Sequence, residues 1–139
     1  MRKLIAVVLF LALALAGVLV WNYIDGLLSR FPDLDFSRSR IGIASWYSET
    51  DPHINEYTAN GEKFRDREIT CATWDYPFGE KLVVINSMNG EYVVCRVNDR
   101  GPGKRLRRSI DLTKAAFKKI AHTEKGLIYV TIIPTAKKK

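Results

Sequence analysis

The side chains best suited to chemistry include a carboxylate beside a turn. Asp99 lies in Asn98-Asp-Arg-Gly-Pro102, directly after an alternating apolar run that predicts a strand. A carboxyl group at a strand end next to a Gly-Pro turn is well placed to face a cleft. Glycoside cleavage needs such a group to protonate the leaving oxygen, often with a second carboxylate nearby. The alternative is that Asp99 only caps the turn through the backbone.

Two other acidic residues are weaker candidates for a chemical role. Glu62 lies in the polar segment 57–64, which by itself is typical of a solvated loop. Asp111 stands just ahead of apolar residues at 112, 115, 116, 117 and 120, a spacing that predicts an amphipathic helix over 112–121. Asp111 is therefore at or next to the helix N-cap position.

The chain has two cysteines, Cys71 and Cys95. In an exported protein such a pair indicates a disulfide, and closing a loop of about 25 residues would contribute about 3 kcal/mol. The alternative is two small buried thiols, because Cys95 lies among valines. The cysteines, together with His53 and His122, lack the spacing of a zinc site. We expect no metal ion and no cofactor.

The charge is basic, with 22 Lys+Arg against 15 Asp+Glu and a net charge of +7. Such a surface favours polyanions, although it is equally typical of a soluble, mildly basic protein. Arg105, Arg107 and Arg108 form a basic cluster that is either a charged loop or a contact for anionic groups along a glycan. Nucleic acid is not an expected partner, because the N-terminus indicates export.

Export is indicated by Met1-Arg-Lys3, which precedes an uncharged apolar run from Leu4 to Trp21. About 18 helical residues span roughly 27 Å, close to the thickness of a hydrocarbon core. The two basic residues favour a cytoplasmic N-terminus. Cleavage after Ala16 is the alternative, because Ala14-Leu-Ala16 has the small-x-small form of a signal peptidase site. The apolar run continues past that site, which favours an uncleaved anchor.

The rest of the chain is organised as a linker, one domain and a tail. The pattern predicts an anchor over 1–28, a linker over 29–40, a domain over 41–134 and a basic tail over 135–139. Within the domain, alternating and β-branched residues predict strands over 41–47, 81–86, 91–97 and 126–133. Asn89-Gly90 predicts a hairpin turn between two of them. Short strands with one short helix indicate a small β-barrel.

Taken in order, the segments of the domain resemble the RlpA-like (rare lipoprotein A) double-psi β-barrel family. Each segment alone is weak, but their order across residues 42–116 is specific. The matching segments are Gly42-Ile-Ala-Ser-Trp-Tyr47, Thr58-Ala-Asn-Gly-Glu-Lys-Phe64, Thr70-Cys-Ala72, Pro77-Phe-Gly79, Val84-Ile-Asn86, Asn89-Gly90, Val93-Val-Cys-Arg-Val-Asn-Asp-Arg-Gly-Pro102 and Ile110-Asp-Leu-Thr-Lys-Ala-Ala116.

The resemblance implies a mainly β fold: a six-stranded double-psi β-barrel with one or two short helices, here preceded by an N-terminal transmembrane helix. It also implies lytic transglycosylase activity, which cleaves the MurNAc-GlcNAc bond of peptidoglycan and leaves a 1,6-anhydro sugar. The muramic 6-hydroxyl replaces water, so a single acid/base can serve. The alternative is a non-catalytic, expansin-like module that binds cell-wall glycan. Expected partners are glycan strands, the membrane through the N-terminal helix, and a cell-division or envelope complex.

The resemblance also assigns residues. Asp99 matches the aspartate of the family's Asn-Asp-Arg-Gly-Pro motif and is the candidate acid/base, while Glu62 matches an acidic residue that could polarise or bind substrate. Thr73 stands where the family commonly has histidine, and threonine cannot carry a proton near neutral pH. The residues assigned to substrate binding are Tyr47, Thr73, Trp74, Arg100, Arg105 and Asp111. The domain is expected in the periplasm or extracellular space, held at the cytoplasmic membrane or secreted if the anchor is cleaved.

Overall fold

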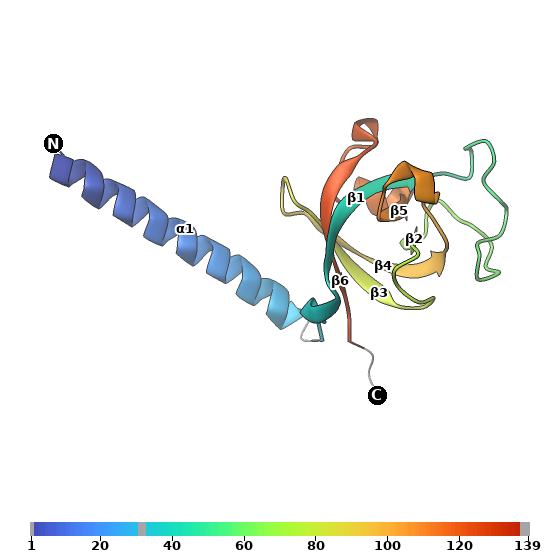
Figure 1. Ribbon diagram of the computed structural model, residues 1–139, viewed down its shortest axis with the longest axis horizontal. Coiled ribbons are helices and arrows are strands. Elements are labelled where there is room, and N and C mark those ends of the chain that lie inside the picture. Colours follow the sequence, from blue (N-terminus) through green and yellow to red (C-terminus); the bar gives the residue numbers. More distant parts are fainter. Residues whose placement is uncertain (1, 31–32, 137–139) are drawn as a thin grey trace. The chain divides into compact units, whose positions relative to one another are not determined.

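The computed structural model describes residues 2–30 and 33–136, in two units that cover residues 1–34 and 35–139. The first unit consists mainly of the helix α1 (Arg2–Arg30) (Figure 1). Its window Leu11–Arg30 has a mean hydropathy of 1.7, and none of that window is buried. By length and composition α1 could cross a bilayer, although a signal sequence has the same properties.

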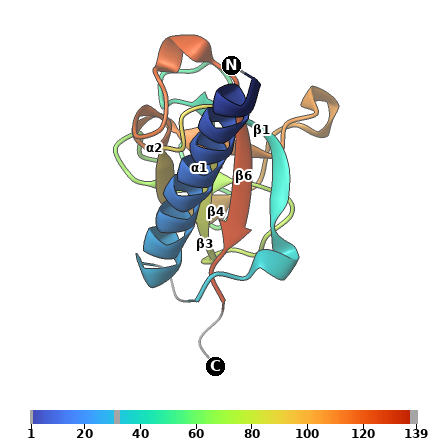
Figure 2. The same cartoon turned by 90° about the vertical axis from the view of Figure 1, so that its left-hand side faces the viewer.

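The second unit is a closed six-stranded barrel, as the sequence predicted. Its strands follow one another around the barrel in the order β1-β5-β2-β4-β3-β6, and β6 closes the ring by pairing with β1 (Figure 2). The elements of this unit are η1 (Phe36–Arg38), β1 (Arg40–Tyr47), β2 (Thr70–Ala72), β3 (Lys81–Asn86), β4 (Tyr92–Asp99), η2 (Lys104–Leu106), β5 (Ile110–Thr113), α2 (Lys114–Lys118), η3 (Thr123–Lys125) and β6 (Ile128–Pro134).

Two of the six strand pairs are parallel, β1 with β5 and β2 with β4. The other neighbours are antiparallel, including the β3–β4 hairpin predicted at Asn89-Gly90. Gly90 has φ of 74°, which glycine adopts without the steric cost that a Cβ brings. The parallel pairs bring the end of β1, the end of β4 and the whole of β5 to one region of the barrel.

The strands β2 and β5 were not among the strands expected from the sequence. They have only three and four residues and are buried at every position, so they are too short for a periodic pattern to reveal them. The expected helix over 112–121 is correspondingly wrong at its start, because Leu112 and Thr113 belong to β5. The regular helix α2 covers only Lys114–Lys118, and its N-cap is Thr113, not Asp111.

The barrel interior is apolar and includes the two cysteines. Cys71 of β2 and Cys95 of β4 are fully buried and form a disulfide, with their Cα atoms 5.9 Å apart. Phe117 of α2 is also fully buried, so this short helix covers part of the core. The site elements therefore rest on a core that is packed and cross-linked.

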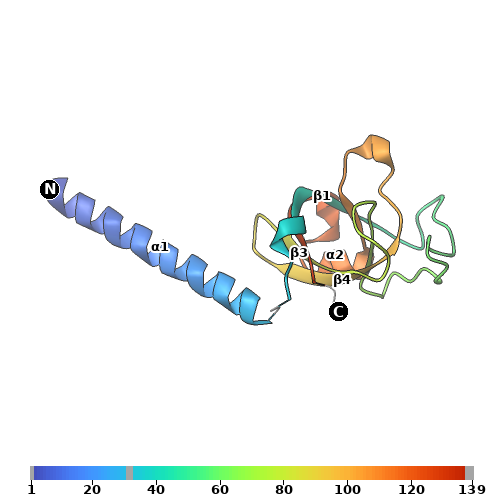
Figure 3. The same ribbon diagram turned by 60° about the horizontal axis from the view of Figure 1, so that its bottom comes forward.

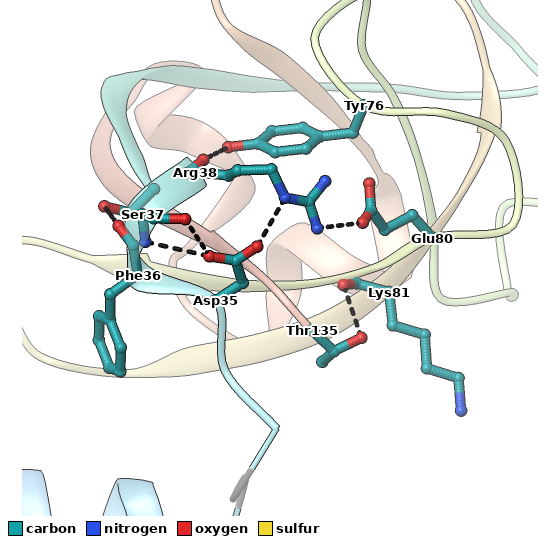
Figure 4. Close-up of polar contacts among 9 residues, drawn as sticks. Asp35, Phe36, Ser37, Arg38, Tyr76, Glu80, Lys81 and Thr135 are labelled. Carbon is teal, nitrogen blue, oxygen red and sulfur yellow. Dashed lines mark hydrogen bonds and ion pairs between the residues drawn. The ribbon is translucent and has the colours of Figure 1, made fainter. Parts of the chain in front are cut away.

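The chain enters the barrel through a polar cluster at η1 (Figure 4). The Arg38 guanidinium donates to Asp35 and to Glu80, in both cases at 2.7 Å. The Tyr76 hydroxyl donates to the Arg38 carbonyl at 2.7 Å, and the Asp35 amide donates to the Pro134 carbonyl at 2.8 Å. These contacts tie the chain to the barrel from Asp35 onward.

Candidate functional site

An open cleft of about 490 Å³ lies where the long loop after β1 meets the loop after β4. In Figures 1 and 3 these are the green segment and the yellow-to-orange segment on the same side of the barrel. The cleft is lined by Tyr47, His53, Ile54, Asn55, Tyr57, Thr58, Ala59, Ala72, Asp99, Arg100, Gly101, Pro102, Gly103 and Asp111.

Asp99 is the last residue of β4 and is half-buried in this cleft. Its Oδ1 accepts hydrogen bonds from the Ala59 and Arg100 amides, both at 2.8 Å. The Asn60 amide donates to the Asn98 carbonyl at 3.2 Å, so the 57–64 loop is docked on the end of β4. Because both hydrogen bonds use Oδ1, the second carboxylate oxygen is left for a ligand.

Asp111 lies on β5, opposite Ser45 in the parallel β1–β5 pair. It is only 9% exposed, and it accepts hydrogen bonds from the Ser45 hydroxyl and from Arg108 Nη2, the latter at 3.3 Å. Burial raises the pKa of the Asp111 carboxyl, and the nearby charge of Asp99 acts in the same direction; Ser45 and Arg108 partly oppose this. Asp111 therefore holds a proton to higher pH than an exposed aspartate does.

Tyr47 connects the two carboxylates. Its ring stacks on Phe64 with centroids 4.6 Å apart, and its buried hydroxyl has no hydrogen-bond partner among the described residues. Burial, followed by the charges of Asp99 and Asp111, raises the pKa of this hydroxyl. Asp99 also raises this pKa as a hydrogen-bond acceptor, so the Tyr47 hydroxyl and the Asp99 carboxylate lie close together in the cleft.

Glu62 does not line the cleft. Its carboxylate accepts two hydrogen bonds from Arg96, at 2.7 and 2.8 Å, and further ones from Asn60 and Asn98. The bonds from Arg96, then those from the two asparagines, lower the pKa of Glu62 to about 2. Glu62 therefore stays ionised near neutral pH and braces the loop that supplies the Ala59 amide to Asp99.

Thr73 is fully buried, and its hydroxyl bonds only to the backbone. The hydroxyl donates to the Ser109 carbonyl at 3.0 Å and accepts from the Asp75 amide at 3.3 Å. Trp74 beside it is 55% exposed, and its indole N–H donates to the Pro102 carbonyl at 2.9 Å. The ring of Trp74 is thus held next to the rim of the cleft, with Lys104 Nζ 5.4 Å from its centroid.

The two predicted arginines differ in their surroundings. Arg100 lines the cleft, but Nη1 donates to the carbonyls of Thr73 and Tyr76, at 2.8 and 3.0 Å, and the guanidinium stacks on Phe78 at 3.7 Å. Arg105 is exposed on η2 and does not line the cleft. The sequence-predicted residues that the cleft brings together are therefore Tyr47, Asp99, Arg100 and Asp111.

Sequence reasoning missed three residues that shape the site. Ser45 and Arg108 hold Asp111, and His53 lines the cleft from the loop after β1. The parallel pairing of β1 with β5 brings Ser45 to Asp111 and has no local sequence signal. Over the described residues, no group of three or more His, Cys, Asp or Glu is placed to hold a metal ion.

Comparison with known sequences gives a family model and relatives that agree with one another. A family model described as "Lytic transglycolase" matches residues 39–132. A "Probable endolytic peptidoglycan transglycosylase RlpA" of Nostoc sp. is 41% identical over 91 residues, which are 66% of this chain and 24% of that protein. An "Endolytic peptidoglycan transglycosylase RlpA" of Pseudomonas aeruginosa is 41% identical over 92 residues, 66% of this chain and 26% of that protein. The chain thus spans about a quarter of the length of these relatives.

Solved structures share the fold. The Streptomyces papain inhibitor has a TM-score of 0.56 at 24% identity, covering 70% of this chain and 94% of that one. An expansin of Clavibacter michiganensis, solved with cellohexaose, has a TM-score of 0.56 at 18% identity, covering 73% of this chain and 52% of that one. At such low identity these likenesses concern the barrel alone.

Proposed function

This chain belongs to the lytic transglycolase family of double-psi β-barrels, and we propose that it is an exported enzyme that cleaves the glycan strands of peptidoglycan. The bond cleaved is the one between MurNAc and GlcNAc, and the product carries a 1,6-anhydro end. Two relatives at 41% identity, one named an endolytic peptidoglycan transglycosylase and one a probable endolytic peptidoglycan transglycosylase, support this assignment.

The single observation that carries the proposal is the pair of carboxylates in the cleft. Asp99 and Asp111 come from different strands and line the same cleft, with the unpaired Tyr47 hydroxyl beside them. Two carboxyl groups in different environments, one of them buried, are the arrangement that most glycoside-cleaving enzymes use. The same cleft is lined mainly by polar groups and backbone, which suits a sugar.

The reaction follows from these groups. A proton from the Asp99–Asp111 pair passes to the GlcNAc O4 as its bond to MurNAc C1 breaks. The MurNAc 6-hydroxyl oxygen then bonds to C1 as its proton passes to a base in the cleft, so no water is needed. Asp99 is the acid/base in contact with the glycan and donates this proton, and Asp111, the more buried of the two, lines the same cleft.

Glycan binding extends beyond the cleft. The exposed face of Trp74, fixed by its bond to Pro102, offers a surface on which a sugar ring can stack. The exposed Arg105 on η2 supplies positive charge for the carboxylates of peptidoglycan stems. The helix α1 tethers the domain to the outer face of the cytoplasmic membrane, where envelope or division proteins are candidate partners.

The test uses the full chain in detergent micelles and purified peptidoglycan. Mass spectrometry of the released fragments distinguishes 1,6-anhydro ends from the reducing ends that hydrolysis would leave. We expect anhydro-muropeptides from the wild type. Fragments with reducing ends only, or no fragments, would contradict the proposal.

A non-catalytic wall-binding role is the second candidate. The observation that favours it is Thr73, which is sealed in the barrel and cannot supply the proton-carrying side chain common in the family. Under this alternative the protein pellets with insoluble peptidoglycan at low salt and releases no fragments. The product assay above separates the two candidates.

A further inference from the structure

His53 is placed differently from the other histidine of the chain. It lines the cleft that holds Asp99 and Asp111, whereas His122 lies at the N-cap of η3. Both imidazoles are exposed. Among the described residues that line the cleft with the two carboxylates, His53 is the one imidazole.

The backbone at His53 is held in an unusual conformation. Its φ of 74° is in the left-handed region, which few residues other than glycine adopt. Such conformations persist where the surroundings over-determine them, and they concentrate at functional sites. Here the Ser48 amide donates to Asp51 Oδ2 at 2.8 Å, and the Ile54 amide donates to the Asp51 carbonyl at 3.3 Å. The turn is thus fixed on both sides of His53.

The loop that carries this turn is also braced by contacts between its own residues, and the Ala115 amide of α2 donates to the Asp66 carbonyl at 3.1 Å. The Ser48 hydroxyl donates to Asp66 Oδ2 at 2.6 Å, and the Glu49 amide donates to Asp66 Oδ1 at 2.8 Å. At the other end, the Phe64 amide donates to the Glu56 carbonyl at 2.9 Å. A histidine on a braced turn can keep one position relative to the cleft, as a reacting group must.

Outside the carboxyl pair, three other side chains near the cleft are poorly suited to accept a proton. The Arg100 guanidinium is always charged and accepts nothing. The raised pKa of Tyr47 keeps its hydroxyl protonated, so it is a donor. Thr73 is sealed behind the barrel wall. An imidazole, by contrast, exchanges a proton near neutral pH.

We propose that His53 is a catalytic residue that accepts the proton of the MurNAc 6-hydroxyl; this deepens the proposed function and rests on it. The C1–O4 bond breaks as a carboxyl proton passes to O4, and the O6–C1 bond forms as the O6 proton passes to the imidazole. The imidazolium then returns that proton to the carboxylate pair, so the enzyme is restored. The titratable and charged groups around it are Tyr47, Tyr57, Asp99, Arg100 and Asp111 in the cleft and Glu49, Asp51 and Glu56 on its own loop.

The first test compares His53→Asn with His122→Asn in the full chain. Asparagine tolerates the left-handed backbone, so the turn is kept. We expect H53N to form anhydro-muropeptides at least about 100-fold more slowly. We expect H122N to keep the wild-type rate. A role of His53 confined to folding would also lower the thermal unfolding temperature of H53N, which we expect to match that of the wild type.

A second test leaves His53 unchanged. In H122N, diethyl pyrocarbonate acylates the one remaining imidazole, and we expect product formation to stop, with bound glycan protecting against the loss. Product formation by H53N at the wild-type rate, or by acylated H122N, would overturn the role of His53 and leave the proposed function in place. Absence of anhydro products from the wild type would overturn the proposed function and this inference with it.

Discussion

Because Asp111 is buried, ionisation of its carboxyl group destabilises the folded barrel. The Ser45 hydroxyl and Arg108 offset part of the cost of desolvation, but the pKa of the carboxyl remains raised. The folded protein then binds the proton to higher pH than the unfolded chain does. Stability therefore falls as the pH rises through the folded pKa.

This predicts the pH dependence of the variant Asp111→Asn. An amide keeps an acceptor for Ser45 and never ionises, so D111N gains stability relative to the wild type as the pH rises from 4 to 7. Thermal unfolding of both proteins across this range measures the difference. The exposed Asp75→Asn serves as the control and is expected to show no such trend. A pH-independent difference for D111N would contradict the burial argument.

Glu62 has the opposite linkage. Because its pKa is lowered to about 2, its contribution to stability is present above about pH 4.5 and is lost as the pH falls toward 2. Its side chain is 38% exposed, so solvent screens the pair with Arg96. We expect Glu62→Gln to cost about 0.5 kcal/mol at pH 7. Denaturant titrations at pH 7 and pH 2.5 should show the cost shrinking in acid, whereas Glu124→Gln is expected to have no effect at either pH.

Among the elements, the contact between β1 and the segment before β5 depends on a glycine. A Cβ at Gly42 would overlap the side chain of Ser109, which precedes β5. We expect Gly42→Ala to destabilise the barrel by about 1–3 kcal/mol through overpacking. Gly103→Ala is the matched control, because its Cβ would come no closer than 3.8 Å to Leu106. In a denaturant titration, Ser109→Gly is expected to restore the stability lost in Gly42→Ala. If it does not, the loss of stability does not arise from this contact.

The disulfide joins the parallel neighbours β2 and β4 with a sequence separation of 24. It restricts the unfolded chain, so its loss should cost about 3 kcal/mol by the chain-entropy model. The check is the denaturation midpoint of the Cys71→Ala/Cys95→Ala double variant against the oxidised wild type. An unchanged midpoint would show that the bond adds no stability.

The lengths of the strands, and the distance in sequence to their partners, explain which features could be predicted. The strands β1, β3, β4 and β6 have six to eight residues and carry readable alternation, and Asn89-Gly90 marks the hairpin. The strands β2 and β5 are defined by partners distant in sequence. For that reason Asp99, beside a local turn motif, was visible as a cleft residue. No local pattern indicated the pairing of Asp111 with Ser45, the ion pair of Glu62 with Arg96 or the placement of His53 in the cleft.

At the scale of the whole molecule, the net charge of +7 attracts polyanionic wall material in general. The proposed binding of glycan also requires a local contribution from the positive charges of the η2 loop. We expect Arg105→Gln/Arg107→Gln to weaken pelleting with insoluble peptidoglycan at low salt more than Lys118→Gln/Lys119→Gln does. Both pairs are exposed and remove two charges, so equal losses would assign binding to net charge alone.

In the proposed mechanism, a carboxylate at the end of β4 cleaves a glycan that the cleft holds. The most direct measurement follows, in one incubation of full-length protein with insoluble peptidoglycan, both the anhydro-muropeptides released and the protein retained in the pellet. The account predicts that Asp99→Asn is retained like the wild type but releases at least about 100-fold less product, while Asp75→Asn matches the wild type in both. Equal product from D99N and the wild type would contradict it.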